Sequence, residues 1–512
     1  MEVSTVFSRA PAGLEAPLVR VEVHLGTGLP TFALVGLPEA VVRESRDRVR
    51  AALVTAGYDF PQRRITVNLS PADLPKEGGR FDLPIAVGIL AADRRIQCGR
   101  LEQCEFYGEL SLGGALRETR KLLPALIAGA KAGREIILPA ANSLEAGLVN
   151  GGNLRMMNHL DQVVEALGGR AAPRSPLRST PVARHPTPNE SSIRSKPVPD
   201  LAEVRGQYAA KRALEIAAAG DHGMLMIGPP GAGKTLLAQR LPGLLPPLND
   251  QEILEVACLE SAAGRRPSAG KRRPFRSPQH TASVAALIGG GAMRPGELSL
   301  AHLGVLFLDE FPEFPRNALE ALREPMESGT VILARLKRTC EFPARFQLIA
   351  AMNPCPCGYA GDVRGRCHCT AEQIARYRGR ISGPLIDRID IHVELAALPV
   401  EQLMGNAPQE TETSAAVAGR VAAARELQLR RQGKFNARLT PLEVAEICPV
   451  AKEPRMLLSA AILRLGLSAR AYHRVLKVAR TCADLNSAPD IRTIDVAEAV
   501  KLRALDRPVD YA

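Results

Sequence analysis

The sequence predicts an α/β protein in three parts: an N-terminal α/β domain, a central domain with a parallel sheet, and a C-terminal helical domain. Three observations lead to this prediction. A glycine-rich loop stands between a strand pattern and a helix pattern at 224–241, strands and helices alternate before it, and helical periodicity dominates from residue 414 onward. Residues 168–200 contain seven prolines among Arg, Ser and Thr, and we expect them to form a linker.

The first 167 residues are expected to fold as one α/β domain. Apolar and polar residues alternate at 18–24 and again at 65–69, which indicates two strands. Helical periodicity at 39–56 and an apolar run at 82–92 indicate one amphipathic helix and one buried helix.

The central domain, expected at 201–395, begins with a phosphate-binding loop that fits the pattern G-x-x-x-x-G-K-[ST]. Its residues are Gly228, Pro229, Pro230, Gly231, Ala232, Gly233, Lys234 and Thr235. In such loops the backbone N–H groups surround a phosphate, the lysine reaches the β- and γ-phosphates, and the hydroxyl binds Mg²⁺. An apolar strand at 224–227 precedes the loop and a helix at 236–241 follows it, which is the context that nucleotide binding requires.

A second strand pattern, at 305–308, ends in two acids that suit hydrolysis. We expect Asp309 to hold Mg²⁺, directly or through water, and Glu310 to orient and deprotonate the attacking water. The alternative, a pair of exposed acids at a strand end, is disfavoured so soon after a complete phosphate loop. A further apolar strand at 346–352 ends in Asn353, which is placed to position the water or to sense the γ-phosphate.

Four cysteines lie close together in a loop rich in glycine and proline. Cys355, Cys357, Cys367 and Cys369 form C-x-C-x₉-C-x-C, and four thiolates can complete a tetrahedral Zn²⁺ site. His368 is a spare ligand. Because C-x-C pairs strain the coordination geometry more than C-x₂-C pairs do, a metal-free loop remains the alternative.

Charge and composition narrow the choice of partner and compartment. The chain has 512 residues, a net charge of +12 and a pI of about 9.4, and a basic surplus favours nucleic acid or an anionic membrane as the partner. With no Trp and 4% aromatic residues, contact with the DNA backbone is favoured over base stacking. The sequence has no long apolar stretch and no signal-peptide pattern, so we expect a cytoplasmic protein with reduced thiols and no membrane contact.

Several stretches resemble the AAA+ ATPases of the magnesium-chelatase-like group, and most closely the ComM (YifB) family of bacterial competence-associated proteins. They lie at 277–283, 295–302, 308–314 and 353–358, and matching segments run from near residue 3 to about 507. Where the family usually has two histidines, this chain has Gln279-His280.

The resemblance implies ATP and Mg²⁺ as cofactors and a ring-forming, hexameric motor that acts on DNA. It also implies movement of DNA branches during homologous recombination, notably in natural transformation. Composition and spacing alone give only an oligomeric ATPase with DNA as the favoured partner.

A cationic turn resembles the pore hairpin of helicase-like AAA+ rings. Arg335, Lys337 and Arg338 stand between strand patterns at 330–334 and 341–346. Phosphate contacts from such a tip carry no sequence information but give a salt-dependent grip on DNA. A solvated turn is the alternative.

The last part, 396–512, is expected to be a helical lid with helices at 414–431, 441–447, 454–465, 468–486 and 493–504. Arg470 falls in a first helical turn, where a cation opposes the helix dipole. Together with the resemblance, this predicts that Arg470 reaches the γ-phosphate in cis, against the alternative of an ordinary surface arginine. Arg380 and Arg388 are candidate arginine fingers for a neighbouring subunit.

Two other basic stretches are candidates for DNA binding. The first is a loop at 265–273, and the second, at 425–438, is interpreted as a solvated helix face.

The N-terminal pattern resembles the Lon-protease fold without its catalytic residues. The serine of that fold would fall near 78–82, where this chain has none, and the lysine would fall at 113–117, where it has Arg117. Arginine stays protonated and cannot act as a general base, so no acyl chemistry is expected.

Three functions are compatible with these features: a DNA-translocating hexameric ATPase, a chelatase-type or chaperone-like remodelling ATPase, and an ATP-dependent protease. The missing serine and lysine tell against the protease. The net positive charge of the chain and the cationic turn favour the DNA motor over the remodelling ATPase.

Overall fold

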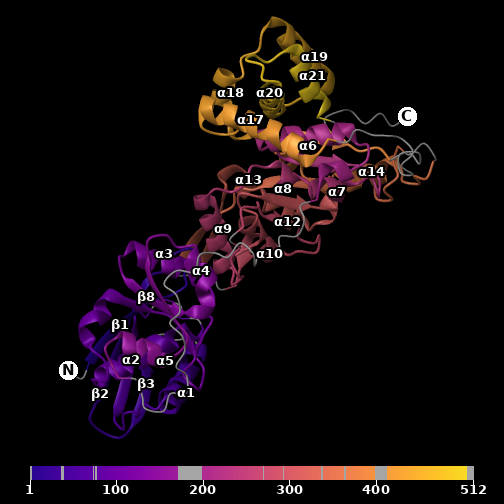
Figure 1. The fold of residues 1–512 in the computed structure, drawn as a ribbon. Coiled ribbons are helices and arrows are strands. Elements are labelled where there is room, and N and C mark those ends of the chain that lie inside the picture. The colour runs from indigo at the N-terminus through magenta and orange to yellow at the C-terminus, as the bar shows by residue number, and fades with distance from the viewer. Residues whose placement is uncertain are drawn as a thin grey trace.

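The computed structural model has three parts that follow one another along an elongated molecule (Figure 1). It describes residues 3–35, 40–72, 74, 76, 78–170, 199–268, 270–291, 293–335, 338–361, 365–397, 412–503 and 505. The mixed α/β fold with a parallel sheet and a helical C-terminal region is confirmed. The linker predicted at 168–200 lies almost wholly outside the described residues and stays a prediction. Within the described part of the chain, no helix combines the length and the apolar character needed to cross a membrane.

The N-terminal part is a seven-stranded mixed sheet in the order β3-β4-β2-β1-β5-β8-β9. Its strands are β1 (Val3–Arg9), β2 (Leu18–Gly26), β3 (Thr31–Val35), β4 (Arg64–Ser70), β5 (Cys104–Phe106), β8 (Glu135–Pro139) and β9 (Asn153–Met157), with β6 (Glu109–Leu110) and β7 (Leu116–Arg117) as a separate pair. Its helices are α1 (Ala40–Thr55), α2 (Asp82–Ala92), α3 (Leu123–Lys131), α4 (Ser143–Gly147) and α5 (Leu160–Ala166). The four elements predicted here, two strands and two helices, are confirmed within two residues at each end.

The helix α2 is the centre of this domain's core. All eleven of its residues are buried, because its sequence is apolar around the whole circumference, and it packs on β1 and β2. Each large side chain that it buries, such as Leu83 or Ile89, contributes about 1.5–3 kcal/mol. In the turn just before α2, Arg80 is buried and donates to the carbonyls of Arg9, Arg120 and Lys121.

The central part is a five-stranded parallel sheet in the order β11-β14-β17-β10-β18. Its strands are β10 (Met224–Ile227), β11 (Phe275–Arg276), β14 (Val305–Leu308), β17 (Gln347–Met352) and β18 (Ile391–Glu394). Around it lie α6 (Tyr208–Gly220), α7 (Lys234–Ala238), α8 (Leu241–Leu244), α9 (Asp250–Ala262), α10 (Val284–Ile288), α11 (Glu297–Leu300), α12 (Arg316–Glu320), α13 (Arg323–Ser328), α14 (Ala371–Arg378) and α15 (Gly383–Ile386). Parallel strands end at one edge, so the residues that follow β10, β14 and β17 meet there.

Two short hairpins accompany this sheet: β12 (Gly289–Gly290) with β13 (Arg294–Pro295), and β15 (Thr330–Arg335) with β16 (Arg338–Pro343). In the second hairpin, Arg335 pairs with Arg338, so the second strand begins three residues earlier than predicted. Residues 336–337 and the side chains of Arg335 and Arg338 lie outside the described part of the structure. The grip on DNA predicted for Arg335, Lys337 and Arg338 therefore stays a prediction.

The N-terminal and central parts meet along α3 and α9. Ser261 on α9 donates to the buried Glu145 at 2.8 Å and accepts from the backbone N–H of Leu123 at 3.3 Å. In the basic loop at 265–273, Arg266 forms an ion pair with Glu118 of the N-terminal part at 3.0 Å. That loop joins two parts of the molecule rather than offering only free cations.

The helical part consists of α17 (Ser414–Gln432), α18 (Pro441–Ile447), α19 (Lys452–Leu465), α20 (Ala469–Leu485) and α21 (Thr493–Lys501), so all five predicted helices are confirmed. The interpretation of 425–438 as a solvated helix face holds only in part, because the side chain of Arg430 is 73% exposed but other cations of this stretch are held by contacts. Arg425 is only 5% exposed and donates to the carbonyl of Ala218 on α6, and Arg438 pairs with Asp221. The sequence alone does not show that this face of α17 packs on α6.

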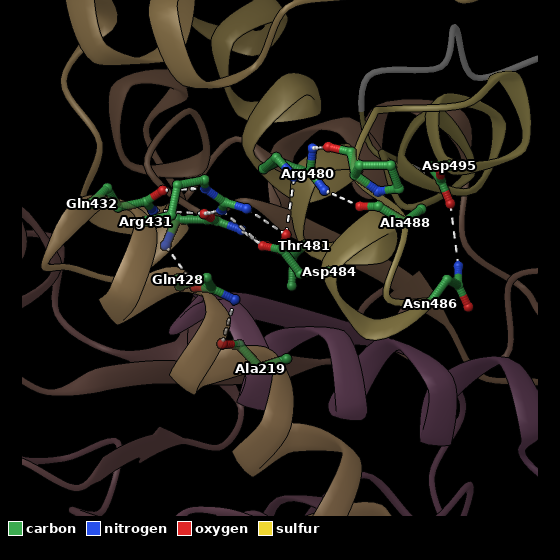
Figure 2. A network of polar contacts seen from close by, with 12 residues as sticks. Ala219, Gln428, Arg431, Gln432, Arg480, Thr481, Asp484, Asn486, Ala488 and Asp495 are labelled. Atoms are coloured by element: carbon green, nitrogen blue, oxygen red, sulfur yellow. Dashed lines mark hydrogen bonds and ion pairs between the residues drawn. The ribbon is translucent and has the colours of Figure 1, made fainter.

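A buried polar network holds the lid together (Figure 2). Asp484 accepts two hydrogen bonds from Arg431, at 2.7 and 3.0 Å, and a third from Arg480. Arg480 also donates to the carbonyls of Ala488 and Pro489, just beyond the end of α20. Gln428 reaches the carbonyl of Ala219 at 3.2 Å and so extends the network into α6.

A second network joins the lid to the end of the central sheet. The carboxylate of Asp390, which lies directly before β18, contacts His222 at 2.8 Å and forms an ion pair with Arg474 of α20. His222 is also 2.8 Å from the hydroxyl of Thr481. Burial alone would raise the pKa of Asp390, but Arg474 and His222 hold this pKa well below its ordinary value.

Replacing Asp390 by Asn should destabilise the protein by about 3 kcal/mol, because Arg474 would keep its charge without its partner. The pKa of Asp390 is lowered on folding, so this stabilisation is present above about pH 4 and is lost as the pH falls further. Urea unfolding at several pH values measures the effect. Asp490→Asn, at an exposed position on the same lid, is the matched control, and an equal effect of both changes would contradict the assignment.

Candidate functional site

The phosphate-binding loop connects β10 to α7 at the carboxyl edge of the central sheet. Gly231 and Gly233 have φ of +78° and +91°, the left-handed region that glycine adopts without strain. The loop is anchored to the sheet because the N–H of Gly228 donates to the carbonyl of Met352, the last residue of β17. The loop thus leads into the start of α7 at the carboxyl edge of the sheet, and a helix N-terminus in this setting suits a bound phosphate.

The side chain of Lys234 folds back over the loop. Its ammonium group donates to the carbonyls of Gly228 at 2.6 Å and Pro229 at 3.0 Å, and to Oδ1 of Asn353 at 3.1 Å. Burial lowers the pKa of Lys234, and the nearby Asp309 opposes that change. All three N–H groups of Lys234 thus have an acceptor within the site. Phosphate oxygens of a bound triphosphate could take the place of the carbonyl oxygens of Gly228 and Pro229 as acceptors.

Thr235 and Asp309 meet as the sequence predicts for a pair of magnesium ligands. The hydroxyl of Thr235 donates to Oδ2 of Asp309 at 2.7 Å, while Oδ1 of Asp309 accepts from the N–H of Glu310 at 2.9 Å. A hydroxyl and a carboxylate are oxygen donors of the kind Mg²⁺ prefers. The residues present thus fit Mg²⁺ bound together with a triphosphate.

Glu310 is the most unusual residue of the site. Its φ of +51° is rare for a residue other than glycine, and such outliers concentrate at functional sites. Its carboxylate lies 2.9 Å from Nδ1 of His280, in the loop that follows β11. Sequence reasoning gave His280 no role. The only signal was its place in the stretch 277–283, one of those that carry the family resemblance.

Asn353 follows β17 directly and connects the phosphate loop with the segment after the strand. Besides accepting from Lys234, it lies beside Tyr377 of α14, whose pKa is raised to about 12 chiefly by burial. The structure therefore brings together Lys234, Thr235, Asp309, Glu310 and Asn353 at one edge of the sheet, although they are up to 119 residues apart in the chain.

Arg388 and Arg470 lie at the opposite end of the same sheet. They line one cavity of about 380 Å³ with Gly223, which precedes β10, and Gln347, which begins β17. Arg388 is ion-paired there with Glu327. Because the phosphate loop follows the last residue of β10, this arrangement does not bring either arginine to the phosphates of its own chain. The cis position expected for Arg470 is not the one that the structure has.

Arg380 lies elsewhere. Its guanidinium contacts Glu313 at 2.5 Å, only three residues after Glu310, so it belongs to the carboxyl edge of its own sheet. Of the two candidate fingers, Arg388 is therefore the one on the face away from its own phosphate loop.

The four cysteines converge. Their sulfur atoms all lie within 4.8 Å of one another, and Cys355 Sγ is 3.2 Å from Cys357 Sγ and 3.8 Å from Cys367 Sγ. Burial acts to raise the pKa of Cys357, but hydrogen bonds from the Tyr359 N–H and from the other thiols lower it to about 6. A backbone hydrogen bond lowers the pKa of Cys369, but its contacts with Cys357 and Cys355 raise that pKa to about 12, so the cluster favours one thiolate, the form that binds metal, at Cys357. His368, the spare ligand, is not part of the cluster.

The fold and the site define a class of protein. The five-stranded parallel sheet, the phosphate loop, the Thr235–Asp309 pair and the helical lid are those of an AAA+ ATPase of the magnesium-chelatase type. Three family descriptions match the chain: "Magnesium chelatase, subunit ChlI" at 200–403, "Subunit ChlI of Mg-chelatase" at 21–142, and "Magnesium chelatase, subunit ChlI C-terminal" at 411–503.

Whole-chain relatives narrow this class further. Competence protein ComM of Haemophilus influenzae is 48% identical over 510 residues, which cover 99% of this chain and 98% of that protein. YifB of Escherichia coli is 46% identical and YifB of Salmonella typhimurium 47% identical over the same extent. The chain belongs to the ComM/YifB family.

Two substitutions should separate nucleotide binding from hydrolysis. Lys234→Ala removes the ammonium group from the phosphate loop and should abolish binding of ATP. Glu310→Gln keeps the loop, Thr235 and Asp309, so it should bind ATP normally but turn over at least about 10²-fold more slowly, because general-base catalysis contributes this much. Titration with a fluorescent ATP analogue and a phosphate-release assay measure the two properties. Equal loss of binding in both variants would contradict this division of roles.

Proposed function

We propose that the protein is an ATP-hydrolysing motor that assembles into a ring, a hexamer, and moves branched DNA during homologous recombination and natural transformation. The observation that carries the ATPase part is the contact of Lys234 with Asn353 and of Thr235 with Asp309 at one sheet edge. The DNA part is supported by the similarity to competence protein ComM and by the net charge of +12.

In the proposed reaction, the loop amides and Lys234 bind the β- and γ-phosphates, and Thr235 and Asp309 hold Mg²⁺. When bound there, Mg²⁺ would supply positive charge beside the phosphate oxygens on which negative charge develops. Glu310 orients the attacking water and accepts its proton, and its contact with His280 through Oε2 holds the carboxylate in place. Asn353, at the tip of β17, fixes Lys234 and senses the γ-phosphate.

Arg388 and Arg470 are assigned to the active site of a neighbouring copy. Both line the cavity at the far end of the sheet, whose lining holds cations and carboxylates together, and Arg388 is ion-paired there with Glu327. In the proposed ring, Arg388 exchanges Glu327 for the anionic phosphates of a nucleotide bound by the neighbouring copy, which a planar guanidinium binds well.

Mixing two inactive variants tests this shared site. Arg388→Ala should bind ATP but lose most of its turnover, since a finger in trans contributes about 10³–10⁵ in rate. Lys234→Ala lacks the other half of the site. Mixed rings contain some interfaces with an intact Lys234 and an intact Arg388, so the mixture should regain ATPase activity that neither variant has alone. A freely exchanging mixture that stays inactive would contradict the assignment, and Arg380 would be tested next.

The DNA-binding role of the hairpin is tested by its three cations. Replacing Arg335, Lys337 and Arg338 together by Ala should weaken binding to all DNA sequences alike. The slope of log affinity against log salt should become shallower by roughly 0.7–0.9 for each phosphate that the variant no longer neutralises. ATP affinity, measured in parallel, controls for folding, because the hairpin is a sheet separate from the one that carries the phosphate loop.

Two measurements, the salt slope of the hairpin variant and the ATPase rate with and without DNA, separate the two functions that remain. An unchanged salt slope with normal branch movement would remove the hairpin from the DNA interface. An ATPase rate that forked, single-stranded and double-stranded DNA all leave unchanged would instead favour a chelatase-type remodelling ATPase.

A further inference from the structure

The four cysteines have the spacing of a metal site. A Zn²⁺ ion held by four sulfurs at about 2.3 Å keeps those sulfurs about 3.8 Å apart. The sulfur distances are 3.2, 3.8 and 3.6 Å between Cys355, Cys357 and Cys367, and Cys369 lies within the same 4.8 Å limit. The N–H of Ala360 donates to Cys355 Sγ at 3.2 Å, which orients this sulfur toward the others. The donor set and its geometry therefore fit Zn²⁺.

This cluster is next to the nucleotide site rather than on a remote surface. Cys355 stands two residues after Asn353, the residue that accepts from Lys234, and Cys369 stands directly before Thr370, which caps α14. The segment between them, described at 355–361 and 365–369, is called the cysteine loop below. The cysteine loop belongs to the stretch of chain that connects the end of β17 to the start of α14.

The cysteine loop also touches the phosphate loop directly. Gly358 has φ of +87°, and a Cβ added there would lie 2.8 Å from Cδ of Pro230, inside the phosphate loop, and 3.8 Å from Cγ of Asn353. Only hydrogen at this position allows the two backbones to pack so closely. The metal ligands, the sensor asparagine and the phosphate loop thus form one packed unit.

We propose that Zn²⁺ bound by the cysteine loop fixes the phosphate loop in its nucleotide-binding conformation, so that metal binding and ATP binding strengthen each other. The physical basis is that four bonds to one ion remove most of the freedom of the cysteine loop, which then holds Gly358 against Pro230 and Asn353 against Lys234. By linkage, the factor by which Zn²⁺ raises ATP affinity equals the factor by which ATP raises Zn²⁺ affinity.

This inference rests on the proposed nucleotide site and is tested on the full chain with a non-hydrolysable ATP analogue, Mg²⁺ and Zn²⁺. Elemental analysis should find about one Zn²⁺ per chain. Removal of the Zn²⁺ with a chelator should weaken binding of the analogue, measured with Mg²⁺ present, about fivefold or more. The analogue should tighten Zn²⁺ binding by the same factor. Both readouts are affinities and do not depend on turnover.

Two glycine variants locate the contact. Gly358→Ala forces Pro230 to shift, so it should keep its Zn²⁺ yet bind the analogue about fivefold or more weakly. Gly361→Ala is the matched control. Its φ is +80°, equally unfavourable for alanine, but an added Cβ there meets no atom within 4 Å, so its affinity for the analogue should remain that of the unsubstituted chain.

The outcomes separate the proposals. If the zinc-loaded chain does not bind the analogue at all, the proposed nucleotide site is wrong. If it binds the analogue equally well with and without bound Zn²⁺, or if no Zn²⁺ is bound by a chain that binds nucleotide, the coupling is wrong and the ATPase proposal stands. Equal weakening by Gly358→Ala and Gly361→Ala would also overturn the assigned contact, because strain alone would then explain the loss of affinity.

Discussion

The parallel register of β14, β17 and β10 is the constraint on which the rest of the site depends. Ile227 pairs with Met352 and Leu308 with Ala350, so the carboxyl ends of the three strands lie within two residues of one another at one edge. Each backbone hydrogen bond contributes only about 1 kcal/mol net, yet together they fix side chains that the chain separates widely. The phosphate loop adds its own hydrogen bond to this edge, from Gly228 to Met352. Preorganised donors of this kind cost little reorganisation when a phosphate binds.

Much of this arrangement could be predicted from the sequence because it is local. The strands at 224–227 and 305–308 are short apolar runs between turn residues, and both are found at the predicted residues. The phosphate loop and Asp309 stand at fixed positions after such strands, so their meeting follows from parallel pairing alone. The cysteines converge for a similar reason, since all four lie in one short loop.

The features that sequence reasoning missed depend on contacts between distant segments. Nothing near His280 in the chain indicates that it faces Glu310, 30 residues later. Arg425 looks like a solvent-facing cation on a polar helix, and only the packing of α17 on α6 buries it. The local pattern places Arg470 in a first helical turn and, with the family resemblance, predicts that it reaches its own nucleotide. The direction in which α20 joins the sheet is instead fixed by the contacts of Asp390 with Arg474 and His222, which no local pattern indicates.

The separation of the phosphate loop from Arg388 and Arg470 by the length of the sheet has an arithmetical consequence. If the arginines complete the site of the next copy, every working site is an interface, and a single chain has none. A closed ring then has as many sites as subunits, whereas an open row of the same subunits has one fewer. The rate per subunit should accordingly rise with protein concentration until the rings close, and then become independent of it.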